Sequence, residues 1–215
     1  KKIEILYRDD YFIAVNKPSG LLTIQDGYKP ELPNLKSILA NQFNKVYTVH
    51  RIDKETSGLL IFALTSESHR KLSLVFEQRK LKKEYRALVS PELPKESLTI
   101  DLPLRVNGDR RHRTIVDPQR GKPAITVITF LRKYNSATVI SASPQTGYTH
   151  QIRAHLAAID CPIINDPLYN PQSINSEHFP PRLLLHSYKI TLLHPFTQQT
   201  IEIIAPLPPG LHFLE

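Results

Sequence analysis

The sequence predicts an α+β protein with a central mixed, largely antiparallel sheet flanked by helices and loops. Short apolar runs of strand length recur along the 215 residues, and predicted strands outnumber predicted helices. With 40% hydrophobic residues, the chain is long enough to bury a sizeable core. Internal repeats, low-complexity tracts and sharp composition breaks are absent from the sequence, so we expect residues 1–215 to form a single domain.

The N-terminal elements are predicted to be a hairpin followed by a helix. Residues 3–7 and 11–16 are apolar runs separated by three charged residues, which predicts two paired strands that lead into a turn at 17–20. Asn34 is a suitable N-cap for a helix that continues to about Phe43, because its side-chain oxygen can accept from a backbone N–H of the first turn.

A loop, a strand and a helix are predicted next. A polar loop over residues 50–58 precedes the continuous apolar run 59–64, which has the length of a buried strand. Ser66 can cap a second helix that carries one apolar stripe. Residues 83–89 then alternate as expected for another strand.

The second half of the chain continues the same mixture of elements. Residues 124–131 and 137–143 alternate like paired strands, and 149–159 show helical spacing. Residues 183–193 and 200–205 are predicted to be the final strands. Because helices and strands do not alternate regularly, the pattern favours an antiparallel or mixed sheet over a doubly wound parallel one.

Two segments lack a clear apolar period. Residues 91–122 are rich in proline and charge, which predicts an extended, mobile basic excursion, and residues 171–181 are expected to form a surface loop. Residues 79–122 contain twelve Lys or Arg and six Asp or Glu, so they hold +6 of the formal net charge of +8. Such a concentration favours a polyanionic partner such as nucleic acid, although a solvated surface explains the same pattern.

The cysteine content and the N-terminal residues indicate the cellular compartment in which the protein works. Cys161 is the only cysteine in the sequence, which excludes an intrachain disulfide and a cysteine-based zinc cluster. The first residues contain no apolar stretch that resembles a signal peptide or a membrane-spanning helix. These features predict a cytoplasmic protein that does not bind membranes.

The strongest candidate for a site is the polar loop at residues 50–58. Its sequence, His-Arg-Ile-Asp-Lys-Glu-Thr-Ser-Gly, surrounds Asp53 with polar and charged side chains just before a predicted buried strand. Loops held by a rigid strand often carry catalytic groups. The alternative is a capped turn, in which Asp53, Thr56 and Ser57 only satisfy backbone donors.

This segment resembles the catalytic motif of RluA-type pseudouridine synthases, in which His-Arg-aliphatic-Asp is followed by two residues and Thr-Ser-Gly. The resemblance implies the pseudouridine synthase catalytic fold and an enzyme that isomerises uridine in structured RNA. Further similarity follows the family's order along nearly the whole chain, at residues 16–20, 83–85, 121–124, 147–155, 165–169 and 182–186.

The resemblance assigns Asp53 as the catalytic nucleophile and implies neither cofactor nor metal. The reaction breaks the glycosidic bond, rotates the base and joins carbon 5 to the ribose, so the carboxylate must reach a base that has been flipped out of the stack. Asp53 attacks the base, attacks the ribose or removes a ribose proton, and these three routes stay open. Asp53 acting with Glu55 in a hydrolase is a weaker alternative, because a turn places the two side chains poorly for acid and base roles.

Three other residues take roles from the same resemblance. Arg153, at the end of the motif 149–153, matches the arginine that pairs with the catalytic aspartate, and a guanidinium favours and orients a charged carboxylate. Tyr85 matches the tyrosine that stacks on the target base and can carry a proton. Arg51 matches a position that fills the gap left by the flipped base. Without the resemblance, Arg153 would be read as a solvated helical residue and Tyr85 as half-buried core.

The resemblance also indicates an RNA-gripping loop at about 104–122. The candidates for RNA contact are Arg51, Arg105, Arg110, Arg111, Arg113 and His150. One departure from the family is Tyr148, which stands where an arginine is common and so removes a positive charge beside the motif. His150 and His155 are five residues apart, about 140° around an ideal helix, so we predict no metal site there.

The expected partner is a stem-loop of tRNA, of rRNA or of both, bound by a monomer. Similarity to the RluA branch favours a uridine in the tRNA anticodon stem-loop and one in 23S rRNA as targets. A synthase for another tRNA uridine is the main alternative. A non-catalytic RNA-binding protein of the same fold is disfavoured, because Asp53, Tyr85 and Arg153 are all present.

Overall fold

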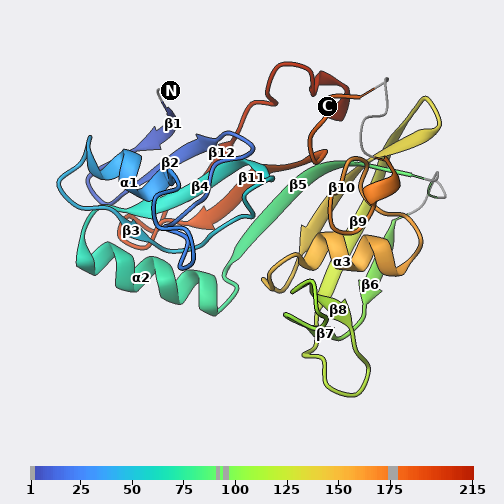
Figure 1. Cartoon of the computed structure of the whole chain (residues 1–215). Helices are drawn as coiled ribbons and strands as arrows, with labels where there is room; N and C mark the ends of the chain where they lie inside the picture. The colour runs from blue at the N-terminus through green and yellow to red at the C-terminus, as the bar shows by residue number, and fades with distance from the viewer. Residues whose placement is uncertain (1–2, 91–92, 94–96, 174–178) are drawn as a thin grey trace. The chain divides into compact units, whose positions relative to one another are not determined.

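The computed structural model describes residues 3–90, 93, 97–173 and 179–215 (Figure 1). These residues fall into two compact units, one built from 1–83 and 187–206 and the other from 84–186 and 207–215. Strands β5 (Leu81–Val89) and β11 (Leu185–Leu193) each contribute residues to both units. That residues 1–215 form a single domain stays a prediction.

The first unit contains an antiparallel sheet that begins with the predicted hairpin. Strand β1 (Glu4–Arg8) pairs with β2 (Phe12–Lys17), and β2 pairs with β4 (Ser57–Ala63). Strand β3 (Tyr47–Thr48) joins β4, and β12 (Thr200–Ile204) pairs with β11. All seven residues of β4 are buried, so the polar loop before it is attached to a strand in the interior of the unit.

Helix α1 (Leu35–Ala40) of the first unit begins where the sequence predicts. The side chain of Asn34 accepts a hydrogen bond from the backbone N–H of Ser37, which confirms its role as N-cap. The helix ends three residues earlier than predicted. Leu35 and Leu39 are its buried residues, and both are fully inaccessible to solvent.

Helix α2 (Ser66–Glu77) packs its apolar stripe on the sheet of the first unit (Figure 1). Its N-cap is Thr65, so the prediction of Ser66 is wrong by one residue. The reason is a capping box, in which Thr65 accepts from the backbone of Ser68 and the Ser68 hydroxyl receives the backbone N–H of Thr65. A cap at Ser66 would place His69, which cannot complete this box in the same way, three residues later.

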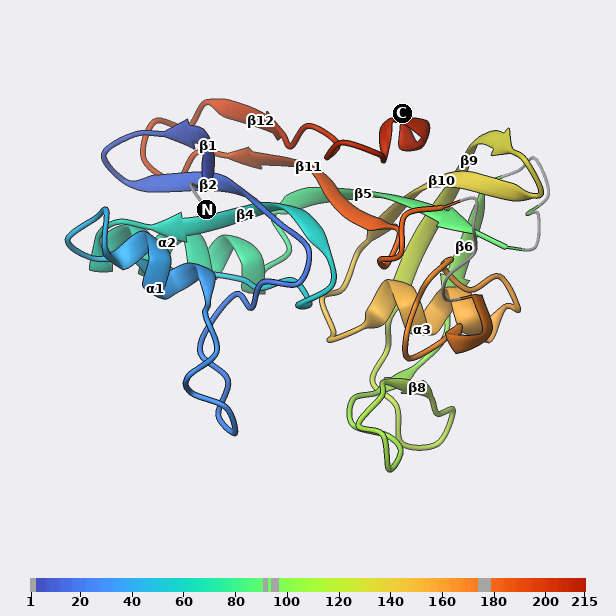
Figure 2. The same ribbon diagram turned by 45° about the horizontal axis from the view of Figure 1, so that its top comes forward.

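The second unit contains a sheet with the strand order β5-β10-β9-β6. Strands β9 (Ile125–Tyr134) and β10 (Ala137–Pro144) form the predicted antiparallel pair, and β6 (Leu98–Asp101) pairs with β9. Helix α3 (Gln151–Ala158) lies beside β9 and β10 in both views (Figures 1 and 2). The α+β class and the largely antiparallel sheet are thus as predicted.

The predicted basic excursion contains more regular structure than expected. Strand β6 covers the start of the described part of this excursion. Residues 104–122 add the strands β7 (Leu104–Arg105) and β8 (Ile115–Val116), which pair with each other (Figure 1). The sequence did not predict these strands within the extended segment. Its strands are only two to four residues long, too short to show an apolar period in the sequence.

Two short 3-10 turns complete the described elements. Within the predicted surface loop 171–181, Pro171–Ser173 form a 3-10 turn, whereas 174–178 lie outside the described residues, as do 91–92 and 94–96 of the basic excursion. A second 3-10 turn covers His212–Leu214. In the described part of the chain, we find no helix that combines the length and the apolar character needed to cross a membrane.

Candidate active site

The loop that carries Asp53 is anchored through its backbone by Lys17. The Lys17 side chain is fully buried, and its ammonium donates to the carbonyl oxygens of Pro18 at 3.0 Å, Leu21 at 2.7 Å and Lys54 at 2.9 Å. A buried ammonium is tolerated only when its donors are satisfied. Lys17 therefore joins the turn after β2 to the residue that follows Asp53.

Further bonds from the same turn fix the backbone on both sides of Asp53. The Thr23 hydroxyl donates to the carbonyl of Ile52 at 2.9 Å, and the Gly20 N–H donates to that of Lys54 at 2.8 Å. The Ser19 hydroxyl donates to the carbonyl of Glu55. The carbonyls before and after Asp53 are thus held by donors from residues 17–23, which accounts structurally for the similarity at residues 16–20.

His50 ties the start of the loop to β4 and α2. Its Nε2 accepts the backbone N–H of Ile61 at 3.0 Å, and its ring stacks on Phe76 with centroids 4.4 Å apart. Burial of the ring, with a smaller effect from the nearby Lys83 ammonium, lowers the pKa of His50 to about 3. His50 is therefore neutral near pH 7 and serves as a hydrogen-bond acceptor, a role that requires the proton to sit on Nδ1.

Gly58 allows the end of the loop to enter the sheet. Its φ of 109° lies outside the range that side-chain-bearing residues adopt, and a Cβ atom here would overlap with the backbone of Ser187. The Ser187 hydroxyl donates to the carbonyl of Leu59 at 3.1 Å. The last residue of the motif is thus a glycine because β11 passes too close for any other residue.

In the second unit, Arg153 is held in a buried bidentate ion pair with Asp166. The Nε of Arg153 lies 2.8 Å from Oδ2 of Asp166, and Nη2 lies 2.8 Å from Oδ1. The two side chains are 1% and 0% exposed. The reading of Arg153 as a solvated helical residue is therefore wrong. Two parallel bonds to one carboxylate fix both the position and the plane of the guanidinium.

Gln151 fixes the N-terminal end of α3. Its amide oxygen accepts from the Thr146 hydroxyl at 2.7 Å and from the Tyr148 N–H at 3.1 Å. Its amide nitrogen donates to the Ile125 carbonyl at 2.9 Å and to the Thr126 hydroxyl at 3.0 Å. The side chain is buried, and all four of its hydrogen-bonding positions are used. The helix that presents Arg153 is therefore attached to β9 at its first turn.

The two histidines near Arg153 have different surroundings. His150 precedes α3 with a φ of 56°, and its Nδ1 lies 3.4 Å from the Tyr169 hydroxyl. His155 is fully buried, with Nδ1 2.9 Å from the Thr126 hydroxyl and Nε2 3.0 Å from the Leu102 carbonyl. Burial lowers the pKa of His155, which favours the neutral ring. His155 thus has a structural role in the interior.

Tyr85 and Tyr148 are both half-buried. Tyr85 lies on β5 opposite Ala142 and packs against the main apolar core of the second unit. Tyr148, at the position where the family commonly has arginine, packs against a small cluster that contains Leu104, Ala124 and Ala154. The departure at Tyr148 thus replaces a positive charge with apolar contacts between the start of α3 and residues 104–122.

The basic loop, defined here as residues 104–122, uses two of its arginines internally. Arg105 forms an ion pair with Asp117 at 2.7 Å, and Arg113 forms one with Asp109 at 2.7 Å. The backbone N–H of Arg113, and next its guanidinium, lower the pKa of the Asp109 carboxyl. The remaining cationic candidates, Arg110 and Arg111 in this loop and Arg51 beside Asp53, are exposed.

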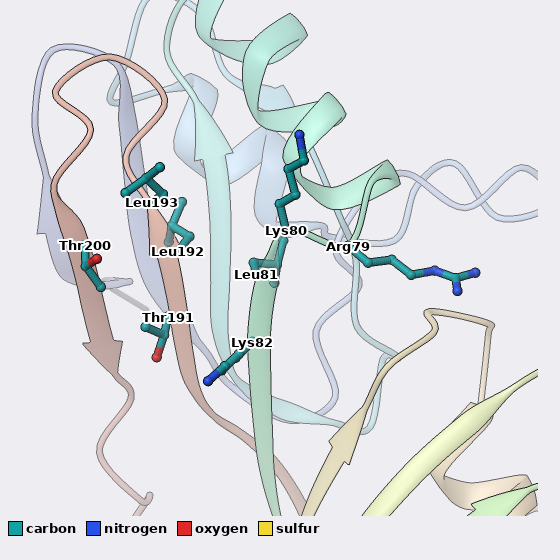
Figure 3. A pocket seen from close by; sticks show the side chains of 8 residues that line it. All are labelled: Arg79, Lys80, Leu81, Lys82, Thr191, Leu192, Leu193 and Thr200. Atoms are coloured by element: carbon teal, nitrogen blue, oxygen red, sulfur yellow. The ribbon is translucent and has the colours of Figure 1, made fainter.

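An open depression in the first unit contains none of the predicted site residues (Figure 3). It is lined by Arg79, Lys80, Leu81, Lys82, Thr191, Leu192, Leu193 and Thr200. In Figure 3, Lys82 points toward Thr191, whereas Arg79 points away from that strand. Among the described residues, no three His, Cys, Asp or Glu side chains gather in a group that could hold a metal ion.

The predicted catalytic residues are divided between the units. Asp53 belongs to the first, and Tyr85 and Arg153 belong to the second, so their convergence remains a proposal.

Lys17, Asp166 and Tyr169 lie in segments that resemble the family, but sequence reasoning gave them no role. A lysine after an apolar strand or an aspartate before a proline resembles many turns, and only the contacts show what these residues hold.

Comparison with known proteins decides the family. Residues 11–158 match the RNA pseudouridylate synthase family. The chain belongs to this family. It is 35% identical over 205 residues to the dual-specificity RNA pseudouridine synthase RluA of Pasteurella multocida, covering 95% of this chain and 93% of the relative. The RluA protein of Escherichia coli K12 is 36% identical over 206 residues, covering 94% of this chain and 92% of the relative. The resemblance to RluA-type enzymes is thus confirmed.

Structural similarity agrees with family membership. The structure of human RNA pseudouridylate synthase domain containing 1 covers 99% of this chain, with a TM-score of 0.80 and 26% identity, and this chain covers 87% of it. Family members are named RNA pseudouridine synthases, which are isomerases, so the chain is an RNA pseudouridine synthase with RNA as its substrate. The hydrolase and the non-catalytic protein considered above are therefore set aside.

Proposed function

We propose that this synthase modifies a uridine in the tRNA anticodon stem-loop, one in 23S rRNA, or both, without metal or cofactor. Similarity to relatives named dual-specificity RluA over more than nine-tenths of the chain supports this choice of target. A relative named ribosomal large subunit pseudouridine synthase D, from Nitrosomonas europaea, is 36% identical over 220 residues, which keeps an rRNA-only target open. A different tRNA uridine is the second candidate.

We further propose that Asp53 is the nucleophile and that it acts on a base flipped out of its stack. One observation carries this proposal: donors from residues 17–23 anchor the backbone carbonyls on both sides of Asp53. Anchoring of this kind positions a carboxylate before the substrate arrives, so less ordering is needed at the moment of reaction. The base must leave its stack because the glycosidic bond is inaccessible within a duplex.

In this proposal Arg153 orients the charged carboxylate of Asp53. Two N–H groups of its guanidinium are directed to Asp166, and a guanidinium carries five in a planar fork. We assign another edge of the same fork to Asp53, where a nearby cation would favour the ionised nucleophile. Asp166 then acts on the reaction only through the direction that it imposes on Arg153.

Tyr85 is proposed to stack on the target base and to help remove the proton from carbon 5 after the new bond forms. Its position on β5 supports this role, because a strand within a sheet holds an aromatic ring more rigidly than a loop. Arg51 is proposed to occupy the gap left by the base. We expect the enzyme to work as a monomer in the cytoplasm.

RNA binding is assigned to the basic loop, to Arg51 and to His150. Within the loop, Arg110 and Arg111 are the stronger candidates for phosphate contacts because they are exposed. Arg105 and Arg113 would have to share their charge with Asp117 and Asp109. These two are expected to shape the loop more than to neutralise phosphates.

Tritium release from RNA labelled at carbon 5 of uridine tests the proposal, because the new carbon–carbon bond displaces the hydrogen at that position. The wild-type enzyme should release tritium from tRNA or 23S rRNA transcripts, and Asp53→Asn should reduce turnover by at least about 10⁴-fold while RNA affinity stays within about threefold. Glu55→Gln is the matched control in the same loop and should retain activity. Appreciable turnover by Asp53→Asn would disprove the role of Asp53.

The target and the absence of a metal need separate measurements. Pseudouridine mapping in cells that lack the gene should reveal one or two missing modifications, and their positions decide between the tRNA and rRNA candidates. A zinc chelator should leave the rate unchanged. Activity lost with the chelator and restored by zinc would contradict the metal-free proposal.

A further inference from the structure

The Tyr169 hydroxyl binds both backbone groups of Thr114 in the basic loop. It accepts the Thr114 N–H at 3.0 Å and donates to the Thr114 carbonyl at 2.9 Å, although the two residues are 55 positions apart. Thr114 is 1% exposed. One hydroxyl thus satisfies a donor and an acceptor that the short β7–β8 pair leaves unpaired at a buried position.

The same tyrosine also contacts the arginine proposed for catalysis. The Arg153 guanidinium carbon lies 5.3 Å from the centroid of the Tyr169 ring, and the Tyr169 N–H donates to Asp166 at 3.1 Å. An aromatic ring beneath a guanidinium attracts it and restricts its movement. Tyr169 therefore contacts both members of the Arg153–Asp166 ion pair.

Arg113 and Thr114 add contacts between the basic loop and this cluster. The Arg113 guanidinium donates to the Leu168 carbonyl at 3.1 Å and lies 5.7 Å from the Tyr169 ring. The Thr114 hydroxyl donates to the Thr149 carbonyl, two residues before α3, at 2.7 Å. Figures 1 and 2 both show β8 beside α3. The loop is thus attached to the segment that carries Arg153.

We propose that Tyr169 is a positioning residue that couples the basic loop to Arg153. This inference rests on the proposed function, in which the basic loop binds RNA and Arg153 orients the carboxylate of Asp53. With Tyr169 in place, Arg110 and Arg111 are held near their bound positions before RNA arrives. Without the Tyr169 hydroxyl, the basic loop would have to become ordered when RNA binds. The free energy needed for this ordering would weaken the affinity for RNA.

Tyr169→Phe tests this inference because it removes the hydroxyl but keeps the ring beneath the two arginines. We expect the dissociation constant for RNA and KM to rise about tenfold, the effect of losing two neutral hydrogen bonds, while kcat stays within about twofold. Tyr134→Phe is the matched control. The centroid of the Tyr134 ring also lies near an arginine, 5.4 Å from the guanidinium carbon of Arg132. The Tyr134 hydroxyl has no hydrogen bond to the described residues. The control should bind RNA like the wild type.

A double-mutant cycle separates coupling through the loop from general destabilisation. If Tyr169 acts through the loop cations, adding Tyr169→Phe to Arg110→Gln/Arg111→Gln should weaken binding by much less than the tenfold expected alone. A full tenfold loss of RNA affinity when Tyr169→Phe is added to the double arginine variant would overturn the inference. A fall in kcat at unchanged KM in Tyr169→Phe would overturn it as well. Thr114→Val, which removes only the bond to Thr149, should act in the same direction by about threefold and provides a second test if Tyr169→Phe folds poorly.

Failure of this inference is distinguishable from failure of the proposed function. RNA affinity and its salt dependence are measured without turnover, whereas the function is judged by tritium release from the wild-type enzyme. If the wild-type enzyme releases tritium but the effects of Tyr169→Phe and of Arg110→Gln/Arg111→Gln on RNA binding are additive, only the coupling through Tyr169 is refuted. Without tritium release from any RNA, the proposed function would fail, whereas the cycle would still report whether Tyr169 positions the loop.

Discussion

The Asp53 loop and the Arg153 cluster are held in place by different kinds of interaction. Around Asp53, side chains and N–H groups of residues 17–23 donate to backbone carbonyls. Around Arg153, the guanidinium forms a buried ion pair with Asp166, and Tyr169 contacts both this pair and the basic loop. One unit thus fixes its candidate nucleophile through the backbone, and the other fixes its candidate cation through a specific partner charge.

Because they are held differently, the Asp53 loop and the Arg153 cluster should respond differently to substitutions. A loop held by its carbonyls keeps its shape when its own side chains change, because every residue supplies a carbonyl. A buried cation depends on one carboxylate, and removal of that carboxylate leaves a desolvated charge without compensation. We therefore expect the Arg153 cluster to be the more fragile of the two, and the following changes test that expectation.

Asp166→Asn should have the largest effect on stability. The amide still offers an oxygen to the backbone N–H groups of Leu168 and Tyr169, so the change mainly removes the charge opposite Arg153. Breaking a buried ion pair by removing one partner costs about 3–5 kcal/mol of unfolding free energy. Urea or thermal unfolding measures the loss. Glu67→Gln, which removes the surface partner of Lys71, is the control and should cost far less.

Lys17→Met should destabilise the protein less than Asp166→Asn, by about 2 kcal/mol. Three carbonyls lose a donor, but the cost of burying an ammonium is also removed, and the two effects partly cancel. Because the loop around Asp53 loses one anchor, kcat should fall more than RNA affinity. Lys36→Met, at an exposed position of α1, is the control. If Lys17→Met is more destabilising than Asp166→Asn, the comparison between the units is reversed.

In the first unit, His50 should make stability depend on pH. Its pKa in the folded state, about 3, lies below the ordinary value of 6.5, so its contribution to stability is complete above pH 6.5 and is lost as pH falls toward 3. Between pH 7 and pH 5 this amounts to about 2 kcal/mol. His50→Gln should flatten the pH dependence of unfolding in this range, measured by urea unfolding of both proteins at a series of pH values. Parallel curves for wild type and His50→Gln would contradict the assignment.

Most regular elements could be predicted because their signals are local. The hairpin β1–β2 and the buried strand β4 follow from apolar runs, and the pair β9–β10 follows from alternating residues. The Asn34 cap follows from one residue type at one position. The N-cap of α2 was missed by one residue because Thr65 and Ser66 are equally suitable caps alone. Only the partner three residues later decides between them.

Most strands and helices, the family, and the choice of Asp53, Tyr85 and Arg153 as candidates could be inferred from the sequence, because each rests on neighbouring residues or on motifs that resemble the family. Only the tertiary structure decided that Lys17 anchors the Asp53 loop, that Asp166 pairs with Arg153, and that Arg105 and Arg113 are engaged within the basic loop. The Thr114–Tyr169 contact, across 55 residues, belongs to the same group. Such pairings depend on which distant side chains share one desolvated space, and no local pattern encodes that.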